Sequence, residues 1–162
     1  MAGSRSSEVL RHSILDRLAG TGGSRSLGDI RIGVEDLKQA VLRDIQWLLN
    51  TKRPLNLQFD AFPEARASIL NFGIPDFTQF SAASGEDCQE VCQLMAEVLR
   101  RFEPRLDPRT VVVEHVISES LSGLAAQFRI QGVLHVDPVR VPIAFDTFLE
   151  TDTGAVSLAA LD

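Results

Sequence analysis

The chain has 162 residues, of which 44% are hydrophobic and 23% charged, a composition typical of a globular protein with one core. It has no run of about 18 apolar residues, and its N-terminal segment interrupts the leucines with charges, so we expect neither a transmembrane helix nor a signal peptide. The net charge of −6 divides into +3 over residues 1–56 and −9 over residues 57–162, and so acidic a body argues against nucleic acid as a partner.

A short amphipathic helix and a flexible linker are predicted ahead of the main domain. Residues 7–18 place four apolar side chains on one helical face, namely Leu10, Ile14, Leu15 and Leu18. The segment that follows, AGTGGSRSLGD, is rich in glycine and serine, as flexible linkers are. A helix of this length is marginal in water, so it packs either on its own domain or on a partner, and the sequence favours neither. We therefore divide the chain into residues 1–28, the helix and linker, and residues 29–162, the main domain.

Two longer amphipathic helices are predicted in the main domain. Residues 34–50 carry acidic side chains in the first turn and an apolar face made of Val34, Leu37, Val41, Ile45 and Leu48. Ser84 and Asp87 resemble a capping box before a second helix over about residues 86–102, whose inward positions are Cys88, Val91, Cys92, Met95, Leu99 and Phe102. Both cysteines are therefore interpreted as small apolar core residues. Residues 51–83 are expected to be irregular, with a turn or short extended piece at FGIPDF.

A small antiparallel sheet is predicted after Pro108, where the apolar period changes from 3.6 to 2. Four segments are rich in β-forming residues or alternate apolar with polar ones: TVVVEHVIS, LAAQFRIQGVLHV, VRVPIAFDTFLE and AVSLAAL. Residues 137–138 and 152–154 have the composition of tight turns, and Pro142 within the third segment indicates a sheet edge or a bulge. The predicted fold class is α+β, with amphipathic helices packed on a small antiparallel meander and a tethered N-terminal helix.

The stretch RRFEPRLDP places opposite charges on both sides of a proline where the second long helix should stop. Pro104 disfavours helical torsions at Glu103, so we expect the chain to straighten there and to project Glu103 and Arg105 to the same side. Two interpretations stay open. The stretch is a helix stop with a surface ion pair, or it is a rigid pair of charges that binds a complementary protein surface.

Four short stretches together resemble the contractile-tail baseplate wedge family, some of whose members are labelled lysozyme-like. These stretches are FEPRL, which carries an EPR motif, LLNTKRP, FGIPDF and SILDRL, and their order and spacing agree with the family from about residue 8 to residue 150. SILDRL resembles the leading element of the type VI secretion branch. Lys52 stands where arginine is common in the family; lysine keeps the charge and loses the planar fork.

The resemblance implies a structural wedge subunit of a type VI secretion baseplate, lying between other wedge subunits and the first ring of the contractile sheath and helping to start sheath polymerisation. It implies that Glu103, Pro104 and Arg105 hold that assembly together. It also implies a cytoplasmic location, in a baseplate docked at the inner membrane of a Gram-negative bacterium, with no direct membrane insertion and no cofactor. We further expect that sheath arms add as strands to an edge of the residue 110–160 sheet, and that the N-terminal helix binds a neighbouring wedge subunit.

Two alternatives from other classes compete with the wedge interpretation. A peptidoglycan-cleaving, lysozyme-like hydrolase needs two carboxylates across a cleft, one of them with a raised pKa, whereas Arg105 should lower the pKa of Glu103. The sequence contains neither a G-x-S-x-G nor a G-x-x-x-x-G-K-[ST] motif. An unrelated adaptor that binds peptides at a sheet edge would use the same kind of surface as the wedge and would differ only in its partner.

Overall fold

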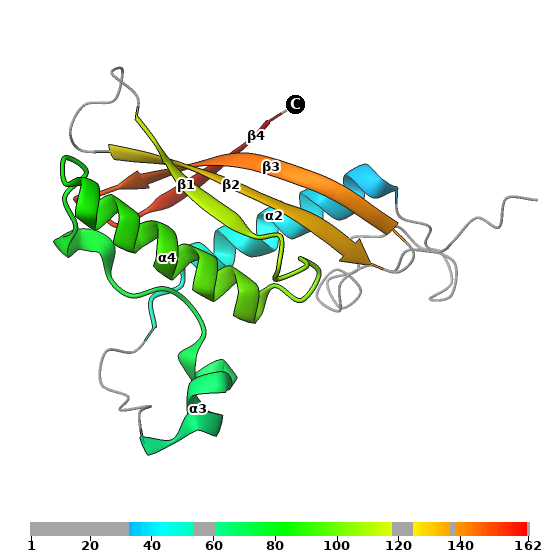
Figure 1. Cartoon of the computed structure of the whole chain (residues 1–162), viewed down its shortest axis with the longest axis horizontal. Coiled ribbons are helices and arrows are strands. Elements are labelled where there is room, and N and C mark those ends of the chain that lie inside the picture. The colour runs from blue at the N-terminus through cyan, green and yellow to red at the C-terminus, as the bar shows by residue number, and fades with distance from the viewer. Residues whose placement is uncertain (1–32, 54–60, 118–124, 137–138, 162) are drawn as a thin grey trace, which may run out of the picture.

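The computed structural model describes residues 33–53, 61–117, 125–136 and 139–161 of the chain (Figure 1). The predicted N-terminal helix with its four apolar residues, Leu10, Ile14, Leu15 and Leu18, lies outside the described residues. The domain boundary at residue 28 therefore stays a prediction. Within the described part of the chain, no helix is long and apolar enough to cross a bilayer.

The described chain consists of helices followed by strands, as predicted for an α+β fold. The helices are α2 (Val34–Asn50), α3 (Pro63–Ala67) and α4 (Gly85–Phe102), with short 3-10 turns at Ile69–Asn71 and Phe77–Gln79. The strands are β1 (Val112–Val116), β2 (Ala125–Val136), β3 (Val139–Glu150) and β4 (Val156–Ala160). They form one antiparallel sheet in the order β1-β2-β3-β4, which confirms the predicted meander.

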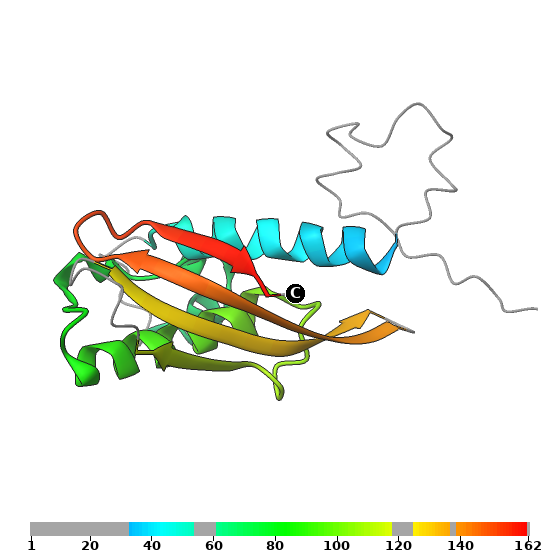
Figure 2. The same ribbon diagram turned by 90° about the horizontal axis from the view of Figure 1, so that it is seen from above.

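Both long helices pack on the same face of the sheet. α4 contacts β1 and α2 contacts β4, so the two helices lie near opposite edges. Figure 2 shows the strands from above, with α2 alongside β4. The core fills the space between the helices and the sheet, and its largest fully buried side chains include Phe77, Phe128, Phe145, Ile45 and Leu149. Cys88 and Cys92 are free and buried in this core, as predicted.

The apolar periodicities predict the buried faces of the helices and strands correctly, apart from small differences at the ends of these elements. On α2 the predicted inward side chains are buried except Val34, which is 38% exposed because the helix meets the sheet only after its first turn. On α4 the capping box is half formed. The Ser84 hydroxyl accepts a hydrogen bond from the Asp87 amide at 3.2 Å, whereas the Asp87 carboxylate binds the amide of Ser81. On β2 the residues Ala126, Phe128, Ile130 and Leu134 are buried, which confirms the predicted alternation.

Strand β3 is longer than its neighbour β4, which pairs only with Phe145–Leu149. Pro142 lies in the part of β3 that β4 does not reach, opposite Val133 of β2. The predicted edge position of this proline is therefore confirmed, although β3 is an inner strand along the rest of its length.

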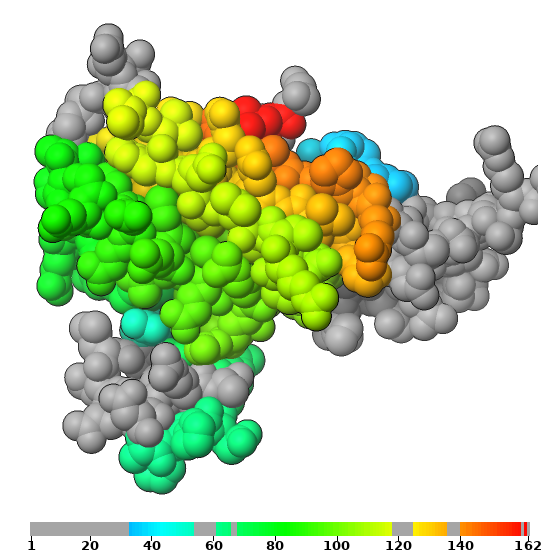
Figure 3. All heavy atoms as spheres, in the orientation of Figure 1, coloured from blue at the N-terminus to red at the C-terminus, as the bar shows by residue number. Residues whose placement is uncertain are grey.

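The irregular region between the long helices has a compact part and a projecting part. Gly73 has a φ of 101°, and this conformation brings Ile74 beside Lys52 in an isolated bridge. α3 stands away from the sheet and the long helices (Figure 3), and the side chains of Phe62, Ile69 and Leu70 around it are exposed.

Candidate functional site

The EPR motif forms a tight turn at the end of α4. The Glu103 amide donates to the Leu99 carbonyl, which closes the helix, and the Glu103 carbonyl accepts from the Leu106 amide at 3.2 Å. Pro104 thus occupies the second position of a turn, for which its fixed φ is suited. The expectation of an extended segment is wrong, because this hydrogen bond folds the chain back directly after the proline.

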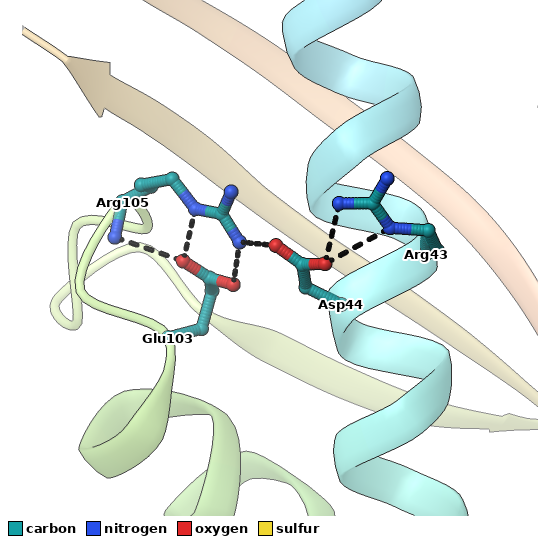
Figure 4. Close-up of polar contacts among 4 residues, drawn as sticks. All are labelled: Arg43, Asp44, Glu103 and Arg105. Carbon is teal, nitrogen blue, oxygen red and sulfur yellow. Dashed lines mark hydrogen bonds and ion pairs between the residues drawn. The ribbon is translucent and has the colours of Figure 1, made fainter. Parts of the chain in front are cut away.

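Glu103 and Arg105 meet across this turn in a bidentate ion pair (Figure 4). The Arg105 Nε lies 2.7 Å from Glu103 Oε1 and the Arg105 Nη2 lies 2.6 Å from Glu103 Oε2. Nη2 also donates to Asp44 Oδ2 of α2 at 2.8 Å, and the other oxygen of Asp44 accepts from Nε and Nη2 of Arg43. We call these four residues, Arg43, Asp44, Glu103 and Arg105, the ionic junction.

The ionic junction runs from the buried Glu103 to the surface, where the side chain of Arg43 is 37% exposed. The side chain of Glu103 is 4% exposed, whereas those of Arg105 and Asp44 are 21% and 23% exposed. The surface position that both sequence interpretations gave to Glu103 is wrong, whereas the binding of a partner by this pair stays a prediction. The turn directs the pair towards α2, where Asp44 supplies a second carboxylate that the sequence analysis did not include.

The two carboxylates of the junction act on the pKa of Arg105. Burial acts to lower the pKa of Arg105, but the hydrogen bonds and charge of Glu103, followed by those of Asp44, outweigh it and hold that pKa above its usual range. Two carboxylates and two guanidinium groups have no net charge together, so the junction is compensated internally. Such a group of residues joins α4 to α2.

The EPR turn is also bound to the sheet. The His135 amide of β2 donates to the Arg105 carbonyl at 2.7 Å, and the Asp107 amide donates to the Val133 carbonyl at 2.9 Å. The turn therefore joins α4, α2 and β2. In the described part of the chain the guanidinium nitrogen Nη1 of Arg105 has no hydrogen-bond partner, and this nitrogen can donate to a group outside the domain.

A second corner brings together the LLNTKRP and FGIPDF stretches. The Arg53 amide donates to the Ile74 carbonyl at 2.9 Å, and the Ile74 amide donates to the Thr51 carbonyl at 2.8 Å. Lys52 Nζ makes a single contact of 2.6 Å with Asp76, so the lysine acts as a point charge without a planar fork. This hydrogen bond is the main cause that lowers the pKa of Asp76.

Asn50 adds the edge of the sheet to this corner. Its amide nitrogen donates to the Val156 carbonyl at 2.8 Å, and its amide oxygen accepts from the Val156 amide at 3.0 Å. The sequence analysis missed Asn50 and Asp44. A signal for Asp44 was present, because it lies three residues after Val41 and four before Leu48, at the border of the apolar face of α2.

The chemistry of these corners is structural. The two carboxylates of the junction share one arginine, and the described residues contain no group of three or more His, Cys, Asp or Glu side chains placed to hold a metal ion. The charges of the junction join elements of the domain itself, which is an arrangement suited to a structural role.

The comparison with known protein families shows which family the chain belongs to. Residues 35–139 match the family described as "Baseplate wedge protein gp25", and the chain belongs to this family of structural baseplate components. The matched range contains LLNTKRP, FGIPDF and FEPRL, whereas SILDRL lies outside it. The chain is also similar to a chain of a solved structure entitled "The baseplate complex from the type VI secretion system", with a TM-score of 0.49 and 16% identity over 72% of this chain and 97% of that one. No curated protein sequence matches the chain significantly.

Proposed function

We propose that this protein is a wedge subunit of a type VI secretion baseplate, where it connects other wedge subunits to the first ring of the contractile sheath and helps to start sheath polymerisation. Membership of the baseplate wedge family supports a structural role, and the resemblance of SILDRL to the leading element of the type VI branch favours that machine. The protein then works in the cytoplasm, in a baseplate docked at the inner membrane of a Gram-negative bacterium.

The single observation that carries a role for the EPR motif is the ionic junction. Glu103 and Asp44 hold the guanidinium group of Arg105 by three hydrogen bonds, so its orientation is fixed before any partner arrives. Nη1 of Arg105, which has no hydrogen-bond partner among the described residues, then donates to a carboxylate or carbonyl group of a wedge or sheath subunit. In this scheme Glu103 and Pro104 position Arg105, and Arg105 makes the contact.

The N-terminal helix is proposed as a second contact, made with a neighbouring wedge subunit. Its four apolar residues, Leu10, Ile14, Leu15 and Leu18, form a face that needs a partner to be buried. A chain lacking residues 1–28 should keep its fold and lose copurification with wedge subunits. Equal copurification of the full and shortened chains would remove the helix from the scheme.

Sheath assembly in cells with a fluorescent sheath subunit tests the role of the EPR motif. We expect Glu103→Ala and Arg105→Ala to abolish or delay sheaths, but each also disturbs a buried ion pair, so soluble protein levels are measured in parallel. Arg105→Lys is the sharper variant, because lysine keeps the charge and cannot reproduce the bidentate fork. Normal levels with absent sheaths support the contact, and normal sheaths in all three variants would refute it.

The two alternative functions make different demands. A lysozyme-like hydrolase needs a carboxylic acid free to donate a proton, whereas both oxygens of Glu103 are held by Arg105. An unrelated peptide-binding adaptor would use the same sheet edge, and wedge and sheath genes beside the gene for this chain would decide against it.

A further inference from the structure

The single tryptophan of the chain is half exposed on α2, although the two residues that follow it are buried. Trp47 is 51% exposed, whereas Leu48 and Leu49 belong to the core. Tryptophan is among the residues that contribute most to the affinity of protein interfaces. One exposed apolar residue is ordinary on a protein surface, so the surroundings of Trp47 decide whether it has such a role.

Arg43 connects Trp47 to the ionic junction. The guanidinium carbon of Arg43 lies 5.2 Å from the centroid of the Trp47 ring, within the range of a cation–π contact. The same guanidinium group donates through Nε and Nη2 to Asp44 Oδ1 at 3.2 and 3.0 Å, and Asp44 Oδ2 accepts from Arg105 (Figure 4). The ring thus packs on a group whose position the junction fixes. We name Trp47, Arg43 and Arg105 the tryptophan surface.

The outward charge of the tryptophan surface is positive. Both oxygens of Asp44 accept hydrogen bonds from arginines, and so do both oxygens of Glu103. Arg43 has the most exposed side chain of the junction, and Nη1 of Arg105 has no hydrogen-bond partner among the described residues. A matching partner therefore presents a carboxylate to the guanidinium groups and a large apolar side chain to the tryptophan ring.

The place of α2 in the chain indicates which partner reaches this surface. The described part begins at Gly33, directly before α2, and Trp47 lies 14 residues further on, about 20 Å along the helix. Residues 19–32, between the predicted N-terminal helix and Gly33, span a similar distance of about 20 Å as a linker of this length. A wedge subunit bound by the N-terminal helix is therefore held within reach of Trp47 at high effective concentration.

We propose that a segment of a wedge subunit binds the tryptophan surface, with a carboxylate on Nη1 of Arg105 and a large apolar side chain on the ring of Trp47. This inference rests on the proposed function; it adds the outer face of α2 to the contact of Arg105 and assigns the chemistry of the partner. The ring supplies apolar area and so most of the affinity, whereas the guanidinium groups orient the acidic group. Because Arg43 already orders the ring, binding costs little side-chain freedom.

Incorporation of 5-fluorotryptophan into the full chain tests the place of contact, because Trp47 then gives the only fluorine signal. Unlabelled, purified wedge subunits of the same bacterium should shift or broaden this signal, and sheath protein should leave it unchanged. Copurification with wedge subunits is measured on the same samples. Copurification without a change of the signal, or a response to sheath protein alone, would overturn the inference and leave the wedge assignment standing. A chain that binds no wedge subunit would overturn both.

Two exposed aromatic residues serve as a matched pair of variants. Trp47→Ala should weaken the binding of wedge subunits by about thirtyfold or more, as expected for a central interface residue. Phe62→Ala removes an aromatic side chain that is 65% exposed near α3, and it should leave binding unchanged. Trp47→Phe keeps a ring for Arg43 and for the partner, so it should retain most of the affinity. Equal affinities of Trp47→Ala and Phe62→Ala would overturn the proposal.

The charge of the partner is tested at Gln46, which is exposed and lies three residues after Arg43, a neighbouring position on the helix surface. Gln46→Lys and Gln46→Glu have similar helix propensities and opposite charges. With an acidic partner the lysine should strengthen binding and the glutamate should weaken it, each by about two- to fivefold at low salt. Both effects should vanish at about 1 M salt. Effects of the opposite sign, or none, would overturn the acidic partner.

Discussion

The Arg105–Glu103 and Arg129–Asp146 pairs have similar geometry and different surroundings. In the first, Nε and Nη2 lie 2.7 and 2.6 Å from the two carboxylate oxygens, and in the second 2.8 and 3.1 Å. The Glu103 pair lies at the junction of α4, α2 and β2. The Asp146 pair lies between directly opposed residues of β2 and β3, on the face of the sheet that the helices leave uncovered.

The two pairs differ in the elements that they connect and in the solvent exposure of their side chains. The Glu103 side chain is 4% exposed and its arginine also reaches Asp44, which is 61 residues away in the sequence. The Asp146 side chain is also buried, at 10% exposed, but its arginine is 37% exposed and its partners Arg129 and Gln127 both come from the neighbouring strand β2. An ion pair between neighbouring strands adds to a contact that the ladder already makes, whereas the buried junction holds together elements with few other direct links.

The largest effect is expected from Arg105→Ala. This change leaves the Glu103 carboxylate buried without a counter-charge, which costs about 3–5 kcal/mol of unfolding free energy. Urea unfolding measures it. Adding Glu103→Gln to this variant should restore part of the loss, because the uncompensated charge is removed. A loss below about 1 kcal/mol would mean that the junction is as weak as a surface pair.

Asp44→Ala should have a smaller effect on the same junction. Arg105 keeps its bidentate contact with Glu103 and loses one charged hydrogen bond, so we expect a loss of about 1.5–3 kcal/mol in urea unfolding. Glu35→Ala is the control on the same helix. Its carboxylate is 72% exposed, and its pair with Lys38 should contribute no more than about 0.5 kcal/mol. Equal losses for both variants would show that Asp44 is no part of the junction.

The sequence predicted the elements well because their periodicity is local. The bounds of α2 and the end of α4 agree with the apolar spacing, and the meander follows from alternation between turns. The position of Glu103 could not be predicted in this way. Its burial depends on a turn hydrogen bond to Leu106 and on a carboxylate from another helix, and local patterns encode neither.

The same limit applies to Asn50 and the sheet edge. An asparagine at the end of a helix is predicted to be a stop signal, and α2 does end there. That its amide also binds Val156, 106 residues later, follows only from the packing of α2 beside β4. The resemblance to the wedge family supplied the EPR motif, and the structure shows that Glu103 of this motif is buried, whereas Arg105 is half-buried and Pro104 is exposed.

Thr147→Val compares a buried hydroxyl group that lacks a partner among the described residues with the paired carboxylates of the junction. The Thr147 side chain is on the core face of β3 and fully buried, and its hydroxyl oxygen has no hydrogen-bond partner within the described residues. Valine has nearly the same shape without the unmet hydrogen bond, so we expect the unfolding free energy to rise by about 1 kcal/mol. A lower free energy of unfolding for the variant, measured by urea unfolding, would mean that the hydroxyl has a partner outside the described residues.

The smallest effect, and the one that depends most on conditions, is expected from Asp146→Asn. The hydrogen bond from Arg129 is the main cause that lowers the pKa of Asp146 below its ordinary value of 3.8. A lowered pKa adds stability above pH 3.8, and this stability is lost as the pH falls through the lowered value. The wild type should therefore exceed Asp146→Asn in unfolding free energy at pH 7, and the difference should vanish in acid.

Salt should weaken the Arg129–Asp146 pair more than the buried Arg105–Glu103 pair. At about 1 M salt the screening length is about 3 Å, so the difference between wild type and Asp146→Asn should shrink at pH 7. The loss caused by Arg105→Ala should change little, because water and ions have less access to Glu103. Urea unfolding of both variants at low and high salt makes the comparison. If salt reduces both losses equally, the two pairs are equally accessible to solvent, and the contrast between junction and open face does not hold.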